Sequence, residues 1–149
     1  MRTFARFPQM TALLALAVAL GVAHASAAPP DAKLYQKTVD KALDFLKNKQ
    51  AADGSFTGAR GEPAVTALIV TSILRNGRPV TDPTVAKGLK YLEGFIQPTG
   101  GIHNPKSPMV NYETCLAIVC LTEANADGKY KKALADADKF IKGMQLDDE

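Results

Sequence analysis

The chain has 149 residues, of which 46% are hydrophobic and 22% are charged, so it has the length of one domain and an ordinary globular composition. Eighteen Lys and Arg residues against 15 Asp and Glu residues give a formal net charge of +3, and the two signs are interleaved along the sequence. This composition excludes a disordered tail and a large multidomain enzyme. It also gives no indication of a nucleic-acid partner or a membrane-surface protein.

The first 27 residues have the three parts of a secretory signal peptide. Arg2 and Arg6 form a basic start, the apolar run 11–22 follows, and Ala25 and Ala27 lie in a pattern of small residues that fits a cleavage site. The run is shorter than the roughly 20 apolar residues of a membrane-spanning helix. We therefore expect residues 1–27 to be removed and the remaining chain to be exported, periplasmic or extracellular, without a membrane span. Because the removed part carries two arginines, 122 residues remain with a formal net charge of +1.

Helix signals dominate residues 28–149, and they predict an all-α fold of five helices. The first, 34–46, is amphipathic, with its charged residues on one half of the helical wheel. Two segments, 64–74 and 112–124, are almost free of charge and are expected to be buried on most sides. A cap and a proline at 81–83 begin a helix that ends at about residue 96, and the last helix follows Gly128 and ends at about residue 144. Solvated and buried helices therefore alternate.

This alternation repeats with a period of about 48 residues. Gln50, Gln97 and Gln145 each close an amphipathic helix, at steps of 47 and 48 residues, and Thr66 and Thr114 hold equivalent places in the two uncharged helices at a step of 48. One unit therefore consists of two helices. Such a unit cannot bury its apolar helix alone, so neighbouring units must stack, either as an α-solenoid or as a closed ring of helical hairpins.

The residues that close these helices resemble the QW motif of the squalene and oxidosqualene cyclases and of the prenyltransferase/squalene oxidase repeat proteins. The first copy has Phe45, Gln50, Gly54 and Phe56. The second copy has Tyr91, Gln97, Gly101 and His103, with one extra residue before its Gln, and the third has Phe140 and Gln145. The resemblance covers nearly all of residues 28–149. It implies a partial α/α-toroid of helical-hairpin repeats, with two and a half repeats in this sequence.

The motif residues are expected to be structural. A Gln just beyond one helix can bond the exposed backbone groups of the next helix, and an aromatic ring two residues after a Gly turn can pack over that junction. The chain has no Trp, and Phe56 and His103 stand where the motif has that residue. We therefore expect these residues to tie neighbouring repeats together, more weakly than Trp would.

The resemblance does not bring the catalytic residues of the family with it. The cyclases protonate their substrate with an Asp-x-Asp-Asp motif, which is absent from the sequence, and we expect Asp136, Asp138 and the acidic cluster 147–149 to be solvated. The protein prenyltransferases hold zinc with Asp, Cys and His, and here only His103 and Cys115 with one of several acids could supply those ligand types, without the clustered spacing of a zinc site. We predict no catalytic, cofactor-binding or metal-binding residue in this chain.

The two cysteines, Cys115 and Cys120, are predicted to be buried free thiols. Export would permit a disulfide. However, five residues along a helix place two side chains about 140° apart and their Cα atoms more than about 7 Å apart, which is too far for a bridge. Both lie in a run expected to be buried, where a thiol is inert.

Two classes of function remain open. The first is an exported scaffold or binding module, whose concave surface between helices engages a protein partner or an apolar ligand. The second is the N-terminal part of a terpenoid cyclase-like or prenyltransferase-like enzyme, whose catalytic residues lie beyond Glu149. We favour the first class, because the repeat ties are present without catalytic acids. An uncapped last repeat leaves apolar surface in water, so self-association is also predicted.

Overall fold

The computed structural model describes residues 31–56 and 62–145. The predicted signal peptide, residues 1–27, and the acidic cluster 147–149 lie outside these ranges. The described residues form five α-helices and no strand, which confirms the prediction of an all-α fold. None of these helices is both long enough and apolar enough to cross a membrane.

The five helices match the five predicted segments. They are α2 (Ala32–Lys49), α3 (Pro63–Arg75), α4 (Pro83–Glu93), α5 (Val110–Glu123) and α6 (Lys131–Lys142). The predicted start of α4 is confirmed in detail, since the Asp82 carboxylate accepts hydrogen bonds from the backbone N–H groups of Thr84 and Val85. The ends of α4 and α6 come two to three residues earlier than predicted, because the chain turns there through Gly94 and Gly143.

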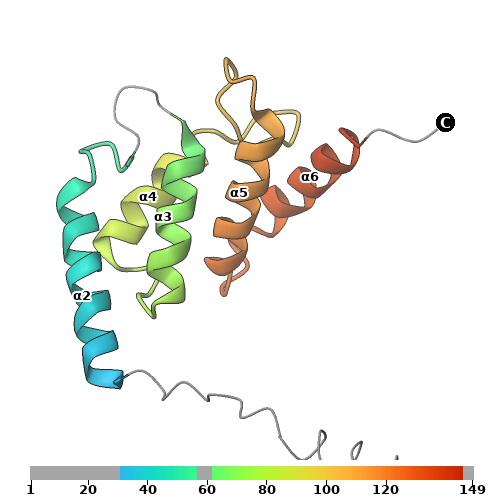
Figure 1. Ribbon diagram of the computed structural model, residues 1–149. Helices are drawn as coiled ribbons and strands as arrows, with labels where there is room; N and C mark the ends of the chain where they lie inside the picture. The colour runs from blue at the N-terminus through green and yellow to red at the C-terminus, as the bar shows by residue number, and fades with distance from the viewer. Residues whose placement is uncertain (1–30, 57–61, 146–149) are drawn as a thin grey trace, which may run out of the picture. The chain divides into compact units, whose positions relative to one another are not determined.

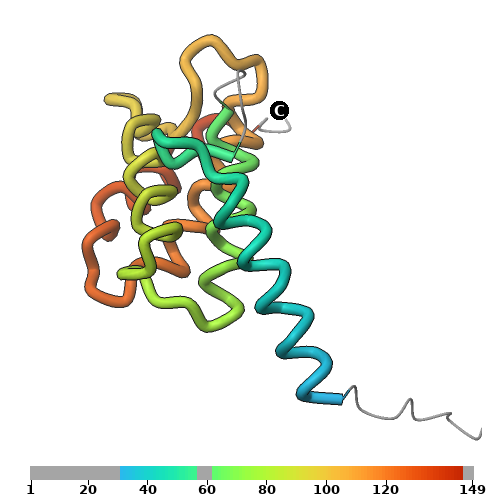
Figure 2. The backbone as a smooth tube through the Cα atoms, turned by 90° about the vertical axis from the view of Figure 1, so that its left-hand side faces the viewer, coloured from blue at the N-terminus to red at the C-terminus, as the bar shows by residue number. Residues whose placement is uncertain are grey.

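The four helices α3 to α6 form two layers. In the first layer, α3 and α5 pack side by side and run in the same direction (Figure 1). In the second layer, α4 packs against α3, and α6 packs against α5 (Figures 1 and 2). Helices joined by a short loop therefore lie in different layers and run in opposite directions, as helical hairpins do.

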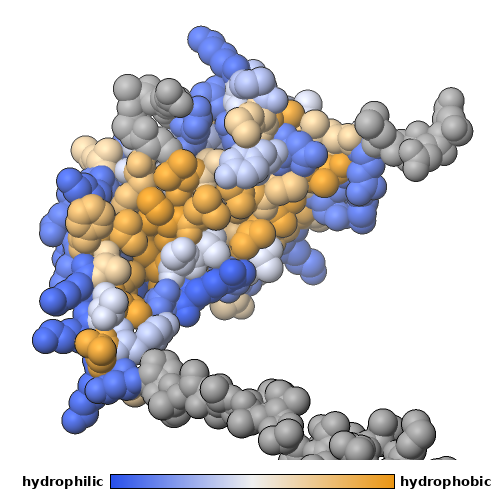
Figure 3. All heavy atoms as spheres, viewed as in Figure 1, coloured by the Kyte–Doolittle hydropathy of each residue, from blue (hydrophilic) through white to orange (hydrophobic). Residues whose placement is uncertain are grey.

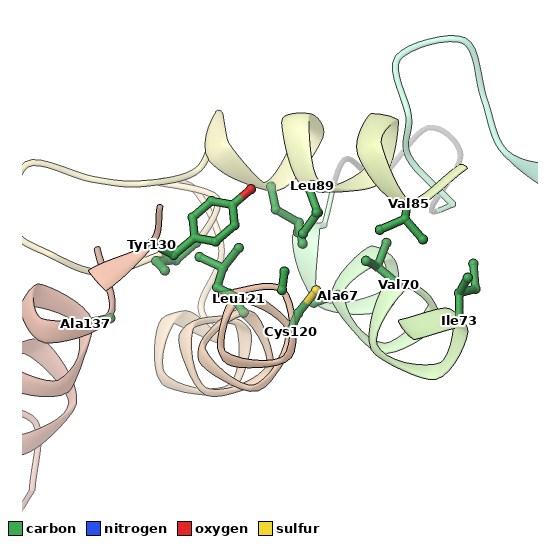
Figure 4. Close-up of a cluster of buried hydrophobic side chains, with 13 residues drawn as sticks. Ala67, Val70, Ile73, Val85, Leu89, Cys120, Leu121, Tyr130 and Ala137 are labelled. Atoms are coloured by element: carbon green, nitrogen blue, oxygen red, sulfur yellow. The ribbon is translucent and has the colours of Figure 1, made fainter. Parts of the chain in front are cut away.

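The hydrophobic core lies between the two layers (Figure 4). Val85 and Leu89 of α4 point toward Val70 of α3 and Leu121 of α5, and all four side chains are buried. Burying one such side chain contributes about 1.5–3 kcal/mol relative to leaving it in water. Small residues line the contact between α3 and α5, where Ala67 lies beside Cys120, so these two helices approach closely.

Helix α2 is held less firmly than the other four helices. It contributes no buried residue, and only near its C-terminal end do Leu43 and Leu46 pack against the core. Leu34 and Tyr35 are 63% and 57% exposed, and the first half of the helix extends away from its neighbours (Figure 2). The apolar half of this amphipathic helix is therefore covered along only part of its length.

Candidate functional site

The first predicted motif copy forms a turn that connects three helices. The Gln50 Nε2 atom donates hydrogen bonds to the Gly54 carbonyl oxygen at 3.0 Å and to the Thr84 carbonyl oxygen, at the start of α4, at 2.9 Å. The Phe56 backbone N–H donates to the Thr66 Oγ1 atom of α3 at 3.1 Å. Residues 50–56, which we call turn 1, therefore join the end of α2 to both α3 and α4.

The second motif copy forms turn 2, residues 97–103, in which Gln97 acts differently. Its Nε2 atom donates to the carbonyl oxygens of Phe95 at 2.9 Å and His103 at 3.1 Å, both in or next to its own turn. The Ile102 backbone N–H donates to the Thr114 Oγ1 atom of α5 at 3.1 Å, as Phe56 does to Thr66. The two threonines thus have the same role, whereas the two glutamines do not.

Each turn contains a glycine that lies directly on the next amphipathic helix. Gly54 and Gly100 both have φ of +93°. A Cβ atom would lie 2.3 Å from the Lys87 carbonyl oxygen at Gly54 and 2.6 Å from the Asp136 carbonyl oxygen at Gly100. Gly100 is therefore the counterpart of Gly54 in this conformation, one residue before the Gly101 of the motif alignment. The offset arises because the extra residue before Gln97 displaces the glutamine relative to its turn.

Gly101 and His103 connect turn 2 to α6. The His103 ring stacks on the Phe140 ring with a centroid distance of 5.6 Å and an interplanar angle of 26°. A Cβ atom on Gly101 would lie 2.7 Å from His103 Cδ2 and 2.9 Å from Phe140 Cζ, so this buried glycine leaves room for the stacked pair. By its hydrogen bond to the threonine, however, Ile102 rather than His103 is the structural counterpart of Phe56.

The remaining motif residues lie apart from one another. Tyr91 of α4 meets Phe95 edge-on, with ring centroids 5.0 Å apart. Phe45 of α2 is exposed, and the Lys49 ammonium lies 5.5 Å from its ring centroid. Gln145 is exposed, and its backbone N–H donates to a carbonyl oxygen at the end of α6. These residues do not converge on one site.

The two cysteines differ in their surroundings. Cys120 is buried, as predicted, and burial raises the pKa of its thiol to about 11, so it stays protonated at neutral pH. Cys115 is exposed, so the prediction that it is buried is wrong. The charge-free run of α5 indicates an apolar helix but not which sides are covered, and among the described residues no helix packs over the Cys115 side.

Sequence reasoning missed two buried or partly buried carboxylates that hold the fold. Glu93 of α4 accepts hydrogen bonds from Lys129 Nζ at 2.7 Å and from Tyr130 Oη at 2.8 Å, at the start of α6. Glu113 of α5 is buried and accepts the Asn104 backbone N–H at 2.7 Å. The partners of Glu93 are 36 and 37 residues away, so no local pattern could have indicated them.

The Glu93 cluster perturbs the titration of its members. Burial raises the pKa of Glu93, but the hydrogen bonds from Lys129 and Tyr130 lower it by more, so the net pKa is below its ordinary value. Burial and the hydrogen bond to Glu93 raise the pKa of Tyr130 to about 12. The phenol therefore stays protonated and donates to the carboxylate, which fastens α6 to α4.

No metal-binding geometry occurs in the part of the chain that the structure describes. Within residues 31–56 and 62–145, no three His, Cys, Asp or Glu side chains gather closely enough to hold a metal ion. The His103 ring stacks on the Phe140 ring, and its Nδ1 atom lies 3.1 Å from the Asn104 carbonyl oxygen.

The main candidate site is an apolar surface on the first layer of helices, which we call the inner face. It consists of side chains from α3 and α5: Val65, Leu68, Tyr112, Cys115 and Val119. The four large apolar members are 40–49% exposed. Figure 3 shows apolar side chains gathered over these two helices. Exposed apolar side chains gathered in this way are typical of an interaction surface.

The inner face continues into an open pocket at the N-terminal end of α5. Met109, Tyr112, Cys115 and Met144 are among its lining residues. Met109 is 53% exposed, and methionine side chains adapt readily to different apolar partners. The pocket therefore extends the apolar surface and contains no charged residue.

Comparison with known proteins adds no assignment to this geometry. No family model matches the chain, and no curated protein or solved structure shows significant similarity to it.

Proposed function

We propose that this chain is an exported helical-repeat module that binds a protein partner or an apolar ligand through its inner face. The observation that carries this proposal is the exposure of Val65 and Leu68 on α3 and of Tyr112 and Val119 on α5. Leaving these side chains in water has a free-energy cost, and a partner that covers them recovers about 25 cal/mol for each Å² of apolar surface buried.

The repeat character of the module is part of the proposal. It is supported by the hydrogen bonds from Thr66 and Thr114 at a spacing of 48 residues and by the two glycines with φ of +93° that lie against the following helices. It is also supported by the resemblance of turns 1 and 2 to the QW motif. In the α/α-toroid that this resemblance implies, α3 and α5 would be neighbouring inner helices, and the inner face would be part of the concave surface.

A binding role suits the chemistry of the inner face. Its members are apolar apart from the Tyr112 hydroxyl and the Cys115 thiol, and that thiol donates to Asn111 Oδ1 of its own helix at 3.2 Å. Such a surface favours ligands through apolar contact area rather than through directed hydrogen bonds. The ligand class that fits is an apolar chain, such as an isoprenoid alcohol, or the apolar face of a helix.

A single-tryptophan variant tests this proposal. The sequence has no Trp, so Tyr112→Trp places a lone fluorescent reporter on the inner face. We expect its emission to shift to shorter wavelength when farnesol is added or when the protein concentration is raised, because either partner would remove water from the indole. Tyr35→Trp on α2 is the matched control, since it is similarly exposed but lies outside the inner face, and farnesol should leave its emission unchanged.

The proposal fails if the Tyr112→Trp emission stays constant under both conditions. It also fails if Tyr35→Trp responds to farnesol as strongly as Tyr112→Trp does, because the binding would then not be specific to the inner face.

A further inference from the structure

The two inner-face helices are equivalent in sequence position but are covered on different sides. A shift of 48 residues places Thr66 on Thr114, and it places the 13 residues of α3 on positions 111–123 of α5. Two equivalent pairs are buried in both helices: Thr66 and Thr114, and Ile73 and Leu121. The largest differences lie at the two edges of the pair, where residues of one helix are buried against the other helix and the equivalent residues of that other helix are exposed.

The first difference concerns the side of α3 that lies against α5. Ala64, Ala67 and Thr71 follow one another at helical spacing on this side and are buried. The Thr71 side chain lies close enough to the Cys120 thiol to lower its pKa, so this side meets α5. The equivalent residues of α5 are exposed, and we call them the α5 edge: Tyr112, Cys115 and Val119.

The second difference is the converse of the first. On the side of α5 that lies against α3, Glu113 and Cys120 are buried and Leu116 packs against the core. The equivalent residues of α3 are exposed, and we call them the α3 edge: Val65, Leu68 and Ser72. Each edge therefore repeats, at a shift of 48 residues, one half of the contact that already joins α3 to α5.

We infer that a second copy of this chain occupies these edges, with the α3 edge of one copy packed on the α5 edge of the next. This inference rests on the proposed function, for which it names the partner. In such a contact α5 takes the role of α3, and the α3 helix of the second copy takes the role of α5. The α6 helix that follows α5 then takes the role of α4, and the second copy holds its own α2 in that place, because turn 1 seats α2 on α4 as turn 2 seats α4 on α6. The contact therefore requires α2, which has no buried residue, to move aside. Val119 of one copy then meets Ser72 of the next, as Thr71 meets Cys120 within one chain.

The charges at the end of the contact also suit a second copy. Arg75 and Glu123 hold equivalent positions on α3 and α5, and within one chain they form an ion pair of 2.7 Å. In the contact between copies, Glu123 takes the place of Arg75, and Arg75 of the next copy takes the place of Glu123. Opposite charges therefore meet again. Along successive α3 and α5 helices, Arg75 and Glu123 alternate in sign. A symmetric contact between two α5 edges that run parallel would instead bring two Glu123 side chains together.

Such an association is head-to-tail, because each copy uses two different edges. A single substitution at either edge should therefore abolish it. The two variants are Leu68→Glu on the α3 edge and Val119→Glu on the α5 edge, both at exposed positions where a charge is tolerated in the separate chain. Ala135→Glu, at an exposed position of α6, is the control for the added charge.

The experiment is sedimentation velocity of the full chain, expressed in an exporting host and purified as the cell processes it. We expect the wild type and Ala135→Glu to increase in mass with concentration, and each edge variant alone to remain a monomer. A mixture of the two edge variants should form dimers and nothing larger, because one intact α5 edge and one intact α3 edge remain. This rescue also shows that both variants are folded.

Three results would overturn the inference. They are a wild type that stays monomeric at all concentrations, a mixture of edge variants that does not associate, and an edge variant that still associates by itself. If the wild type is monomeric but farnesol still shifts the Tyr112→Trp emission, the second copy is excluded as the partner while the proposed function stands. If that emission responds to neither condition, the proposed function fails as well.

Discussion

Turns 1 and 2 connect successive helices in the same way but with different side chains. Both contain a glycine with φ of +93° packed on the next amphipathic helix, and in both a threonine accepts a backbone N–H of the turn. The link between one amphipathic helix and the next differs, however. Gln50 bonds the Thr84 carbonyl oxygen of α4, whereas in turn 2 the stacking of His103 on Phe140 reaches α6.

This difference indicates which parts of the motif are interchangeable. The glycine and the threonine fix the path of the backbone, the glycine through its positive φ and its close approach to a carbonyl oxygen, and the threonine through the N–H that its hydroxyl accepts. The glutamine and the aromatic residue connect neighbouring helices, and either one can do so. We therefore expect substitutions of the glycines to lower the free energy of unfolding strongly in both turns. Substitutions of the glutamines should affect the neighbouring helices differently in the two turns.

The largest expected effect follows from replacing the turn glycines. Gly54→Ala and Gly100→Ala each combine an unfavourable φ with a Cβ atom pressed against a backbone carbonyl oxygen, and each should lower the free energy of unfolding by about 2–5 kcal/mol. Gly77→Ala and Gly128→Ala are matched controls, since their φ values of +83° and +80° are similar but no atom lies within 4 Å of the added Cβ. These two variants should lower the free energy of unfolding by about 1–2 kcal/mol, because only the unfavourable φ contributes.

Urea denaturation of the four glycine variants provides the comparison. If all four lose the same stability, the close approach of the turns to α4 and α6 does not contribute, and the account of the two turns is wrong.

The glutamines distinguish the turns. Gln50→Ala removes the hydrogen bond that fastens the end of α2 to α4, and it should cost about 1 kcal/mol and increase amide hydrogen exchange throughout α2. Gln97→Ala removes only hydrogen bonds in or next to turn 2. It should therefore cost a similar amount of stability but leave the amide hydrogen exchange of α6 unchanged. The distinction between the turns would be contradicted if Gln97→Ala increased the amide hydrogen exchange of α6 as much as Gln50→Ala increased that of α2.

The smallest expected effect concerns pH and the junction of α4 with α6. The pKa of Glu93 is lowered from 4.5, so its contribution to stability is complete above about pH 4.5 and is lost as the pH falls through the lowered folded-state value. We expect Glu93→Gln to flatten the loss of stability in that acid range and to cost less than about 1 kcal/mol at pH 7. Thermal unfolding from pH 3 to pH 7 measures this, and unchanged pH dependence in the variant would contradict it.

The sequence predicted the helices well because their signals are local. The cap at Asp82 followed by Pro83, and the uncharged runs of α3 and α5, identify segments without knowledge of what they touch. Contacts between distant segments could not be predicted in this way. The hydrogen bonds of Glu93 to Lys129 and Tyr130 have no local signature, and the exposure of Cys115 depends on which helix covers that side of α5.

The candidate site was predictable in kind but not in detail. An apolar surface between helices followed from the alternation of charged and uncharged segments, but the period alone could not show which residues of an uncharged helix remain in water. Ala67 of α3 and Cys115 of α5 hold equivalent positions, but Ala67 is buried and Cys115 is exposed. Identical spacing in two helices therefore does not imply identical surroundings.

If the two edges of the inner face are halves of one contact, a disulfide between copies should form across them. A chain with Ser72→Cys and a chain with Val119→Cys, both in a Cys115→Ser background, are mixed and mildly oxidised; Cys120 is buried and should not react. We predict a crosslinked dimer that contains one chain of each kind. Crosslinks that form only between two Val119→Cys chains, or no crosslink at all, would contradict the claim.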